Sequence, residues 1–276
     1  MPSRTLKTPA CPRAAGSLHP TAIIHPKTKL GAGVSVGPYT VIGERVTIGP
    51  GTRIGAHCVI EGRTTIGADC EFFTGAVVGS IPQDLKYRGE ETILIIGDRN
   101  KVREYVTLNP GTEGGGGKTV IGSDCLLMAY AHVAHDCLLG NHVVLANSVA
   151  LAGHIVIEDR AIIGGLVGVH QFVRIGTLAI IGGCSRVIQD IPPYSTCVGY
   201  PAKVFGLNSE GLKRAGVGGE VKDRLHHAFR VLFHSKLSMR HALDQMDKEV
   251  ASDNHCPELH HLLDFVRQSK RGVCRA

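Results

Sequence analysis

The sequence lacks tryptophan altogether, and aromatic residues make up only 5% of its 276 positions. This scarcity argues against a core built around large aromatic rings. The sequence also lacks any uninterrupted apolar run near the roughly 18 residues that a membrane helix needs, so we expect no membrane span. The net charge of +6 is spread along the chain. Because a nucleic-acid-binding protein usually carries a dense basic stripe, this charge fits an acidic partner better than DNA or RNA.

A secretory signal and paired cysteines are missing as well. Residues 1–20 are basic and rich in proline but contain no apolar stretch, so we expect a disordered N-terminal tail rather than a signal peptide. The nine cysteines include no Cys-x-x-Cys pair, which argues against a zinc or redox motif. Cys58 and Cys70 are 12 residues apart, as are Cys125 and Cys137. We interpret all four as small apolar core residues, because this interval is twice the repeat described next.

Glycine is abundant, with 35 residues, and it accompanies a repeat of six residues. A period of six fits neither an α-helix nor the simple alternation of an isolated strand. It is typical of the hexapeptide form of the parallel β-helix, in which three short strands and three corners make one coil of 18 residues. Aliphatic residues return at every sixth position, with Phe72 the one exception, in three series: Ile24 to Val78, Ile96 to Leu108 and Ile121 to Val187.

The two breaks between these series, near 80–95 and 109–119, predict loops that leave the prism. Gly114 to Lys118 superficially resembles a phosphate-binding loop, but Thr112 stands where the first glycine should be and another hexad follows instead of a helix. We therefore reject that interpretation. The resulting organisation is a tail over 1–20, a β-helix over 21–206 and a small helical domain over 207–276, with helices near 209–215, 219–234, 238–249 and 257–268.

The sequence contains 15 histidines, and the 18-residue coil predicts that several of them converge. Hexads that begin 18 residues apart lie on one face, so equivalent residues in successive coils are spaced by roughly 5 Å. Asp136 directly follows one of these histidines and could orient its ring, and imidazole suits a general base because its pKa of about 6.5 lies near working pH. Four histidines are predicted to lie along this edge: His132, His135, His154 and His170.

Such a histidine column is compatible with two chemistries. An imidazole could take a proton from a hydroxyl that attacks an acyl group, or three imidazoles could bind a metal, as in the hexapeptide-fold carbonic anhydrases. The spacing alone does not separate them. A chain with a purely structural role is a third possibility, against which the long loops and the helical tail argue.

Six short strings carry a resemblance to a known family. In this order and spacing they resemble the bacterial acyl-ACP–UDP-N-acetylglucosamine O-acyltransferases, which catalyse the first step of lipid A biosynthesis. The likeness extends from about residue 18 to the C-terminus. The strings are QDLKY (83–87), AHVAHD (131–136), LAGH (151–154), VHQF (169–172), IGGCS (181–185) and FGLNSEGLKR (205–214).

The resemblance implies a left-handed β-helix, a cytoplasmic homotrimer and active sites between neighbouring prisms. It implies that His135 is the general base, which takes the proton from the 3-hydroxyl of UDP-N-acetylglucosamine. That oxygen would attack the thioester of an (R)-3-hydroxyacyl group on acyl carrier protein. Asp136 would orient His135, and the Gly153 backbone N–H would stabilise the oxyanion. No metal or diffusible cofactor is implied.

The resemblance also implies substrate contacts and one determinant of acyl-chain length. Gly183 stands where the family adjusts chain length, and a glycine there leaves room for a longer chain. The sequence departs from the family at Asn109-Pro110, where His-Arg is usual, and at Ala215, where a second arginine is usual. Both changes remove positive charge near expected nucleotide contacts, so a 3-amino UDP-sugar, which would give an amide product, is an alternative acceptor. The implied substrate contacts are Asp84, Lys86, His132, His154, His170, Gln171, Asn208, Glu210 and Arg214.

Overall fold

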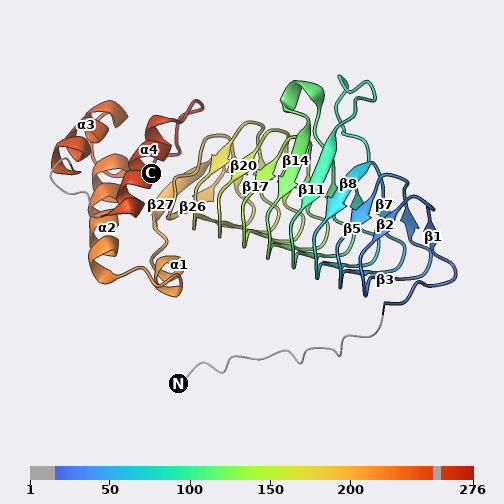
Figure 1. The fold of residues 1–276 in the computed structure, drawn as a ribbon. Coiled ribbons are helices and arrows are strands. Elements are labelled where there is room, and N and C mark those ends of the chain that lie inside the picture. Colours follow the sequence, from blue (N-terminus) through green and yellow to red (C-terminus); the bar gives the residue numbers. More distant parts are fainter. Residues whose placement is uncertain (1–15, 251–255) are drawn as a thin grey trace.

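The computed structural model describes residues 16–250 and 256–276, and their main body is a left-handed parallel β-helix (Figure 1). The predicted tail over 1–20 therefore lies mostly outside the described residues. Its last residues already pair with the prism, because Leu18 forms a parallel bridge with Val36. The strands stack in three sheets, which we call the first, second and third face, and equivalent residues in successive coils are usually 18 apart, as in Val133↔Leu151↔Val169. The predicted fold class is confirmed.

The first face has nine strands, the second eight and the third ten. The first face contains β1 (Ile23–Ile24), β4 (Val41–Ile42), β7 (Val59–Ile60), β10 (Val77–Val78), β13 (Thr107–Leu108), β16 (His132–Val133), β19 (Ala150–Leu151), β22 (Gly168–Val169) and β25 (Arg186–Val187). The second contains β2 (Lys29–Leu30), β5 (Thr47–Ile48), β8 (Arg63–Ile66), β11 (Ile93–Ile96), β14 (Lys118–Ile121), β17 (Leu138–Leu139), β20 (Val156–Ile157) and β23 (Arg174–Ile175). The third contains β3 (Ser35–Val36), β6 (Arg53–Ile54), β9 (Glu71–Phe72), β12 (Lys101–Val102), β15 (Leu126–Leu127), β18 (Val144–Leu145), β21 (Ile162–Ile163), β24 (Ile180–Ile181), β26 (Ser195–Gly199) and β27 (Ala202–Leu207).

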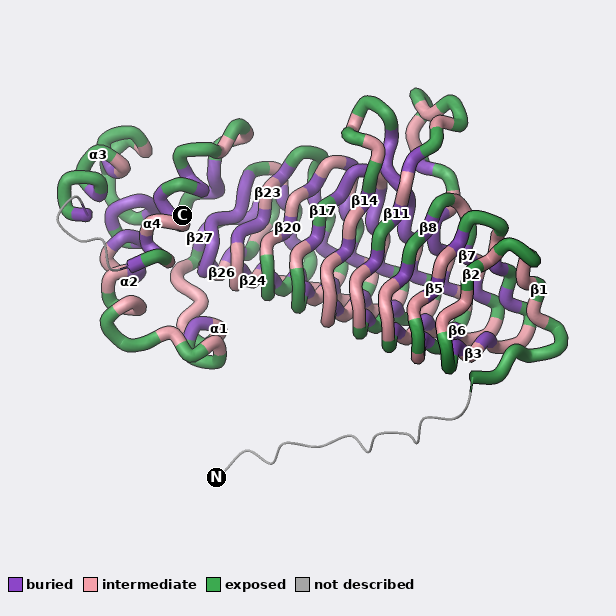
Figure 2. The backbone as a smooth tube through the Cα atoms, viewed as in Figure 1, coloured by how far each residue is buried: buried purple, intermediate pink, exposed green. Residues whose placement is uncertain are grey.

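The period of six positions one aliphatic side chain of each short strand inside the prism. In the two-residue strands of the coils the second residue is the one that is more deeply buried, as Ile60 and Leu145 show, and the buried positions form a continuous column along the axis (Figure 2). Burial of each such side chain stabilises the fold by about 1.5–3 kcal/mol. The core therefore depends on a repeated aliphatic residue rather than on aromatic packing.

Glycine and left-handed backbone have separate roles at the corners. The glycine that often follows the buried aliphatic allows one coil to approach the next, since a Cβ on Gly49 would lie 2.5 Å from the carbonyl carbon of Gly67. Positive φ occurs two residues later, where the residue is usually not glycine, as at Tyr39 (58°) and His57 (55°). The predicted link between corner glycines and positive φ is thus correct only for the close approach.

The four paired cysteines lie in the core, as predicted. Each is buried and donates its thiol to a carbonyl of the next coil, for example Cys137 Sγ to the Ala152 oxygen at 3.2 Å. Thr40 occupies the same place in its hexad and donates to the Gly55 carbonyl at 2.7 Å. Burial raises the pKa of Cys70 and of Cys125 to about 11, so both remain protonated thiols.

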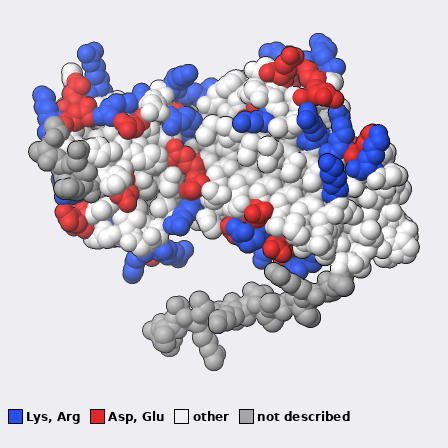
Figure 3. Space-filling model, viewed as in Figure 1, with Lys and Arg blue, Asp and Glu red and all other residues white. Residues whose placement is uncertain are grey.

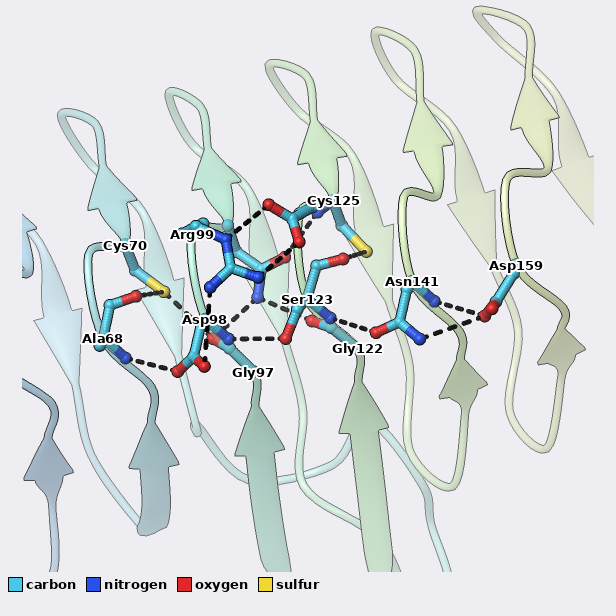
Figure 4. A network of polar contacts seen from close by, with 12 residues as sticks. Ala68, Cys70, Gly97, Asp98, Arg99, Gly122, Ser123, Cys125, Asn141 and Asp159 are labelled. Atoms are coloured by element: carbon cyan, nitrogen blue, oxygen red, sulfur yellow. Dashed lines mark hydrogen bonds and ion pairs between the residues drawn. The ribbon is translucent and has the colours of Figure 1, made fainter. Parts of the chain in front are cut away.

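Polar side chains also link successive coils along the corner between the second and third faces (Figure 4). Asp98 Oδ1 accepts the Ala68 N–H at 2.7 Å, and Ser123 Oγ accepts the Asp98 N–H at 3.0 Å. The series continues as Asn141 Oδ1 accepts the Ser123 N–H at 2.9 Å and Asp159 Oδ1 accepts the Asn141 N–H at 2.7 Å. These bonds satisfy corner amides that the strand ladder leaves unpaired.

Both loop insertions leave the corner between the first and second faces in successive coils (Figure 1). The first loop, residues 79–92, connects β10 to β11, and the second loop, residues 109–117, connects β13 to β14. The second loop holds a 3-10 turn, Glu113–Gly115, and is followed by a strand, which agrees with the rejection of a phosphate-binding loop. The insertions are shorter than predicted because β11 already begins at Ile93.

The helices follow a hairpin that the repeat did not predict. β26 continues the third face in parallel with β24, whereas β27 runs antiparallel to β26, and α2 packs against β27, α3 and α4. No helix among the described residues is long and apolar enough to cross a membrane. The helices are α1 (Ser209–Arg214), α2 (Gly219–Phe233), α3 (Met239–Val250) and α4 (Pro257–Arg267).

Charged side chains are unevenly distributed over the surface in Figure 3. Lysine, arginine, aspartate and glutamate gather along the edges of the prism, on the loops and on the helical part, while the middle of the visible prism surface is largely free of them. The alternation within the short strands explains part of this pattern, because several outward positions are themselves aliphatic, such as Leu138 and Ile162.

Candidate active site

A cavity of about 490 Å³ lies over the first face, beside the coils that carry the predicted histidine column. His132, His135, Gly153 and His170 line it, and Gln83 of the first loop forms part of its wall. Small residues at outward positions of β19 and β22, Ala150 and Gly168, leave room there. The 18-residue coil therefore brings together side chains that are up to 38 positions apart, from 132 to 170.

A vertical column of three side chains stands at the corner next to this cavity. Asp136, His154 and Phe172 occupy the same corner position in successive coils, each with positive φ (60°, 63° and 64°). The ring of His154 stacks on Phe172 with centroids 4.4 Å apart, and His135 meets the edge of His154 at 5.0 Å. The corner geometry, rather than a flexible loop, sets the spacing of these groups.

His135 and Asp136 form a close pair. Nδ1 of His135 lies 2.7 Å from Oδ2 of Asp136, and the Asp136 side chain is 0% exposed whereas that of His135 is 14% exposed. Thr112 of the second loop donates its N–H to Oδ1 at 2.9 Å and its hydroxyl to Oδ2 at 2.6 Å. A carboxylate at Nδ1 stabilises the protonated ring and leaves Nε2 available to exchange a proton with a bound molecule.

Gly153 lies directly against the His135 ring. A Cβ at this position would be 2.5 Å from Cε1 and 2.7 Å from Nε2 of His135, so only glycine leaves the ring its place. Gly153 is the second residue after the buried Leu151, a corner position whose N–H does not join the ladder between coils. Within the described chain this N–H donates to no protein acceptor. A donor beside an imidazole Nε2 is suited to stabilising an oxyanion.

Two further histidines at the site favour their neutral forms. Burial lowers the pKa of His132, and the nearby His135 lowers it further. Nδ1 of His132 lies 2.7 Å from the hydroxyl of Thr107. Burial also lowers the pKa of His154, although Asp136 opposes that effect. Neutral imidazoles can both donate and accept hydrogen bonds, as polar groups of a sugar require.

Asp84 and Lys86 stand on the first loop close enough to influence this column. Oδ1 of Asp84 accepts the Lys86 N–H at 3.0 Å, which orders the turn. Asp84 raises and Lys86 lowers the pKa of His154, as expected for opposite charges near one imidazole. His170 and Gln171 are exposed on the coil below, where Nδ1 of His170 lies 3.2 Å from the Gln171 carbonyl oxygen.

The remaining predicted residues lie elsewhere on the chain. Gly183 is at the corner between the third and first faces, where a Cβ would lie 3.2 Å from the Gly165 oxygen. Asn208 caps α1, accepting the Gly211 N–H at 2.9 Å and donating to the Leu178 carbonyl at 2.8 Å. Glu210 and Arg214 are exposed on α1. Within one described chain none of these four lines the cavity.

Asn109 has a role that the sequence did not suggest. Its side chain is only 4% exposed, and Nδ2 donates to the carbonyls of Ser80 and Ile81 at 2.9 and 3.2 Å. The residue thus ties the base of the first loop to the second loop. The expectation that the change at 109 acts through charge beside the nucleotide is replaced by this structural role. Ala215 forms the C-terminal cap of α1.

The site also contains a set of groups that could approach a metal. One ligand atom each from His135, Asp136 and His154 lies within 4.8 Å of the others. Nδ1 of His135 is already 2.7 Å from the carboxylate, so the pair is arranged for proton exchange as well. The geometry of a single chain is compatible with both chemistries that the histidine column suggested.

Comparison with known proteins separates them. A family model described as UDP-N-acetylglucosamine O-acyltransferase, domain 2, matches residues 190–274, and a model of the bacterial transferase hexapeptide repeats matches residues 118–153. A Myxococcus xanthus protein named acyl-[acyl-carrier-protein]–UDP-N-acetylglucosamine O-acyltransferase is 53% identical over 258 residues, which cover 94% of this chain and 99% of the relative. A Sulfurovum protein of the same name is 48% identical over 257 residues, which cover 93% and 97%.

Solved structures agree with these sequence matches. The LpxA structure from Acinetobacter baumannii superimposes with a TM-score of 0.90 at 43% identity, covering 94% of this chain and 99% of that one. The structure of LpxA from Bacteroides fragilis, described as a UDP-N-acetylglucosamine acyltransferase, gives a TM-score of 0.89 at 41% identity and covers 93% and 99%. The likeness therefore includes both the prism and the helical part.

Proposed function

The chain belongs to the family of acyl-[acyl-carrier-protein]–UDP-N-acetylglucosamine O-acyltransferases, and from this we propose the roles of its site residues. It transfers an acyl group from acyl carrier protein to UDP-N-acetylglucosamine, the first step of lipid A biosynthesis. The relatives give no support to the carbonic anhydrase alternative or to a 3-amino acceptor. The observation that carries the assignment of roles is the His135–Asp136 pair beside the Gly153 N–H.

In the proposed mechanism, Nε2 of His135 takes the proton from the sugar 3-hydroxyl as its oxygen attacks the thioester carbonyl of an (R)-3-hydroxyacyl group. Asp136 stabilises the imidazolium that results, and the Gly153 N–H donates to the oxyanion of the tetrahedral intermediate. When the intermediate collapses, the C–S bond breaks and His135 returns its proton to the departing thiolate. General base catalysis contributes about 10²–10⁴-fold, and one oxyanion donor about 10²–10³-fold.

The surrounding residues are proposed to hold the substrates. Neutral His132 and His154 suit hydrogen bonds to the sugar or the acyl hydroxyl. Asp84 and Lys86 reach the same column from the first loop, where one charge of each sign can bind hydroxyls and phosphate oxygens. His170 and Gln171, on the next coil, are proposed to contact the nucleotide. No metal takes part in this scheme.

We propose that three copies assemble so that a neighbouring chain completes each site. Gly183, Asn208, Glu210 and Arg214 do not line the cavity of their own chain, whereas the resemblance gives them roles in acyl-length selection and nucleotide binding. The first face offers apolar surface for such contact, including Ile23 at 67% and Val41 at 39% exposure. Light scattering of the purified protein measures the mass and tests the trimer.

Mixing two inactive variants tests whether the site is shared. If His135 and Asn208 act in one site but come from different chains, co-refolded His135→Ala and Asn208→Ala subunits regain part of the wild-type rate. Mixtures that stay as inactive as either parent contradict a shared site.

The reaction itself is tested by incubating the protein with UDP-N-acetylglucosamine and a panel of hydroxyacyl carrier proteins, with mass analysis of the products. The analysis reports the acceptor atom and the preferred chain length together. His135→Ala should lose about 10²–10⁴-fold in rate with unchanged folding. His241→Ala, which replaces an exposed histidine of α3, is the control and should keep the wild-type rate. An active His135→Ala enzyme refutes the assigned base.

A further inference from the structure

The second loop covers the catalytic pair in an arrangement that centres on Thr112. Thr112 is buried, and its carbonyl accepts the N–H groups of Gly115 and Gly117 at 3.1 and 2.8 Å, which closes the loop on itself. From this position Thr112 donates twice to Asp136, 24 residues further along the chain. The backbone N–H binds one carboxylate oxygen and the hydroxyl binds the other, so both donors of one residue hold both oxygens of one carboxylate.

Gly115 seals the same carboxylate from outside. A Cβ on Gly115 would lie 2.0 Å from Cγ and 2.1 Å from Oδ2 of Asp136, so the backbone of the 3-10 turn rests on the carboxylate. The neighbouring Gly114 is unlike it, because a Cβ there would meet no atom within 4 Å. The turn therefore keeps water from Asp136, whose side chain is 0% exposed.

Resting on the proposed function, we infer that Thr112 is a positioning residue that controls the proton affinity of His135 through Asp136. Oδ1 is taken by the Thr112 N–H, so only Oδ2 remains for His135, and this fixes the side of the ring on which Asp136 binds. The Thr112 hydroxyl shares Oδ2 with His135 Nδ1. A hydrogen bond donated to a carboxylate disperses its charge and weakens its hold on a neighbouring proton.

Other charged groups also face this pair. His154 Nδ1 lies 3.8 Å from the same Oδ2, and His132 lines the same cavity. Asp84 and Lys86 act on His154 from the first loop. Because the Thr112 test changes none of these groups, a shift in the pH–rate profile can be assigned to the lost hydroxyl.

The decisive comparison is Thr112→Val against Thr112→Ser. Valine keeps the branched shape and the N–H bond but removes the hydroxyl, whereas serine keeps both donors. Thr112→Val should lower kcat about tenfold, with the KM for UDP-N-acetylglucosamine within about twofold of wild type, because a hydrogen bond to a charged group is worth about 1.5–3 kcal/mol. The acid limb of the pH–rate profile should move to higher pH, since an undivided Oδ2 charge holds the His135 proton more firmly. Thr112→Ser should restore both values.

The two adjacent glycines give a second, independent comparison. Gly115→Ala pushes a methyl group into the carboxylate and should lower kcat at least as much as Thr112→Val. Gly114→Ala places the same methyl group in open space on the same turn and should keep the wild-type rate. Equal losses in both alanine variants would indicate a general loop effect and would overturn the inference.

NMR titration of ¹³C-labelled histidine provides a readout that needs no activity. The His135 resonance should titrate at higher pH in Thr112→Val than in wild type and return in Thr112→Ser. An unchanged titration together with an unchanged pH–rate profile overturns the role of Thr112, even when His135→Ala is inactive. Conversely, an active His135→Ala enzyme refutes the proposed base, while the titration still reports whether Thr112 acts on Asp136.

Discussion

Replacing Gly153 with alanine tests how tightly the prism positions the proposed base. The added methyl group would lie 2.5 Å from His135 Cε1, whereas ordinary contact begins at 3.4 Å. The ring or the coil must therefore move by about 0.9 Å, the difference between these two distances. A displacement of about 1 Å from the reactive geometry can cost about 10² in rate. We therefore expect kcat to fall about 100-fold, equal to about 2.7 kcal/mol of transition-state stabilisation.

The assay follows release of the carrier-protein thiol in the presence and absence of UDP-N-acetylglucosamine. Alanine retains the backbone N–H, so the proposed oxyanion donor is still present and the loss reports mainly the displaced His135. Thermal unfolding shows whether the variant is folded. Gly219→Ala is the control, because its methyl group at the exposed first residue of α2 meets no atom within 4 Å. A Gly153→Ala enzyme with kcat within threefold of wild type would refute this reasoning.

Three other substitutions test separate parts of the structure. Asn109→Ala should raise the KM for UDP-N-acetylglucosamine about tenfold and speed hydrogen exchange in the first loop, because it removes a buried amide worth about 1–3 kcal/mol; unchanged exchange would contradict its anchoring role. Phe172→Ala should raise the pKa of His154 toward the ordinary value of 6.5 in an NMR titration, because the stacked ring contributes to the burial that lowers it, and an unaltered titration would count against this. Leu145→Ala should lower the free energy of unfolding by about 2–5 kcal/mol in a denaturant titration, whereas a loss under 1 kcal/mol would mean that the coil closes over the cavity.

The repeat explains why so much of the fold was predictable. Each hexad must bury one aliphatic residue and turn one corner, so the spacing of the aliphatic residues fixes both the strands and the coil to which each belongs. The convergence of His135 and His154 follows directly, since their hexads are 18 residues apart. The family resemblance supplied what spacing alone did not, namely the handedness and the chemistry.

The features that were missed lie where the period does not apply. The contact between Thr112 and Asp136 crosses an insertion whose path no repeat constrains, so its only signal is a threonine before a run of glycines at the base of a loop. Asn109 was assessed by its charge, although its place at the start of that loop decides its role. The antiparallel β27 was missed because the hexads end before β26 and a two-stranded turn has only a weak pattern.

Because the reactive groups are arranged by whole laps of the chain, the length of the solenoid is independent of its chemistry. Removing or duplicating one complete lap far from the insertions would shorten or extend the rod while leaving His135, His154 and Phe172 in mutual contact. Deleting a single residue between 137 and 153 would instead rotate every later side chain to a different wall and dismantle the site. Relatives of this protein can therefore differ by multiples of eighteen residues and still share one reaction centre, which makes lap number a natural coordinate for evolution and for engineering.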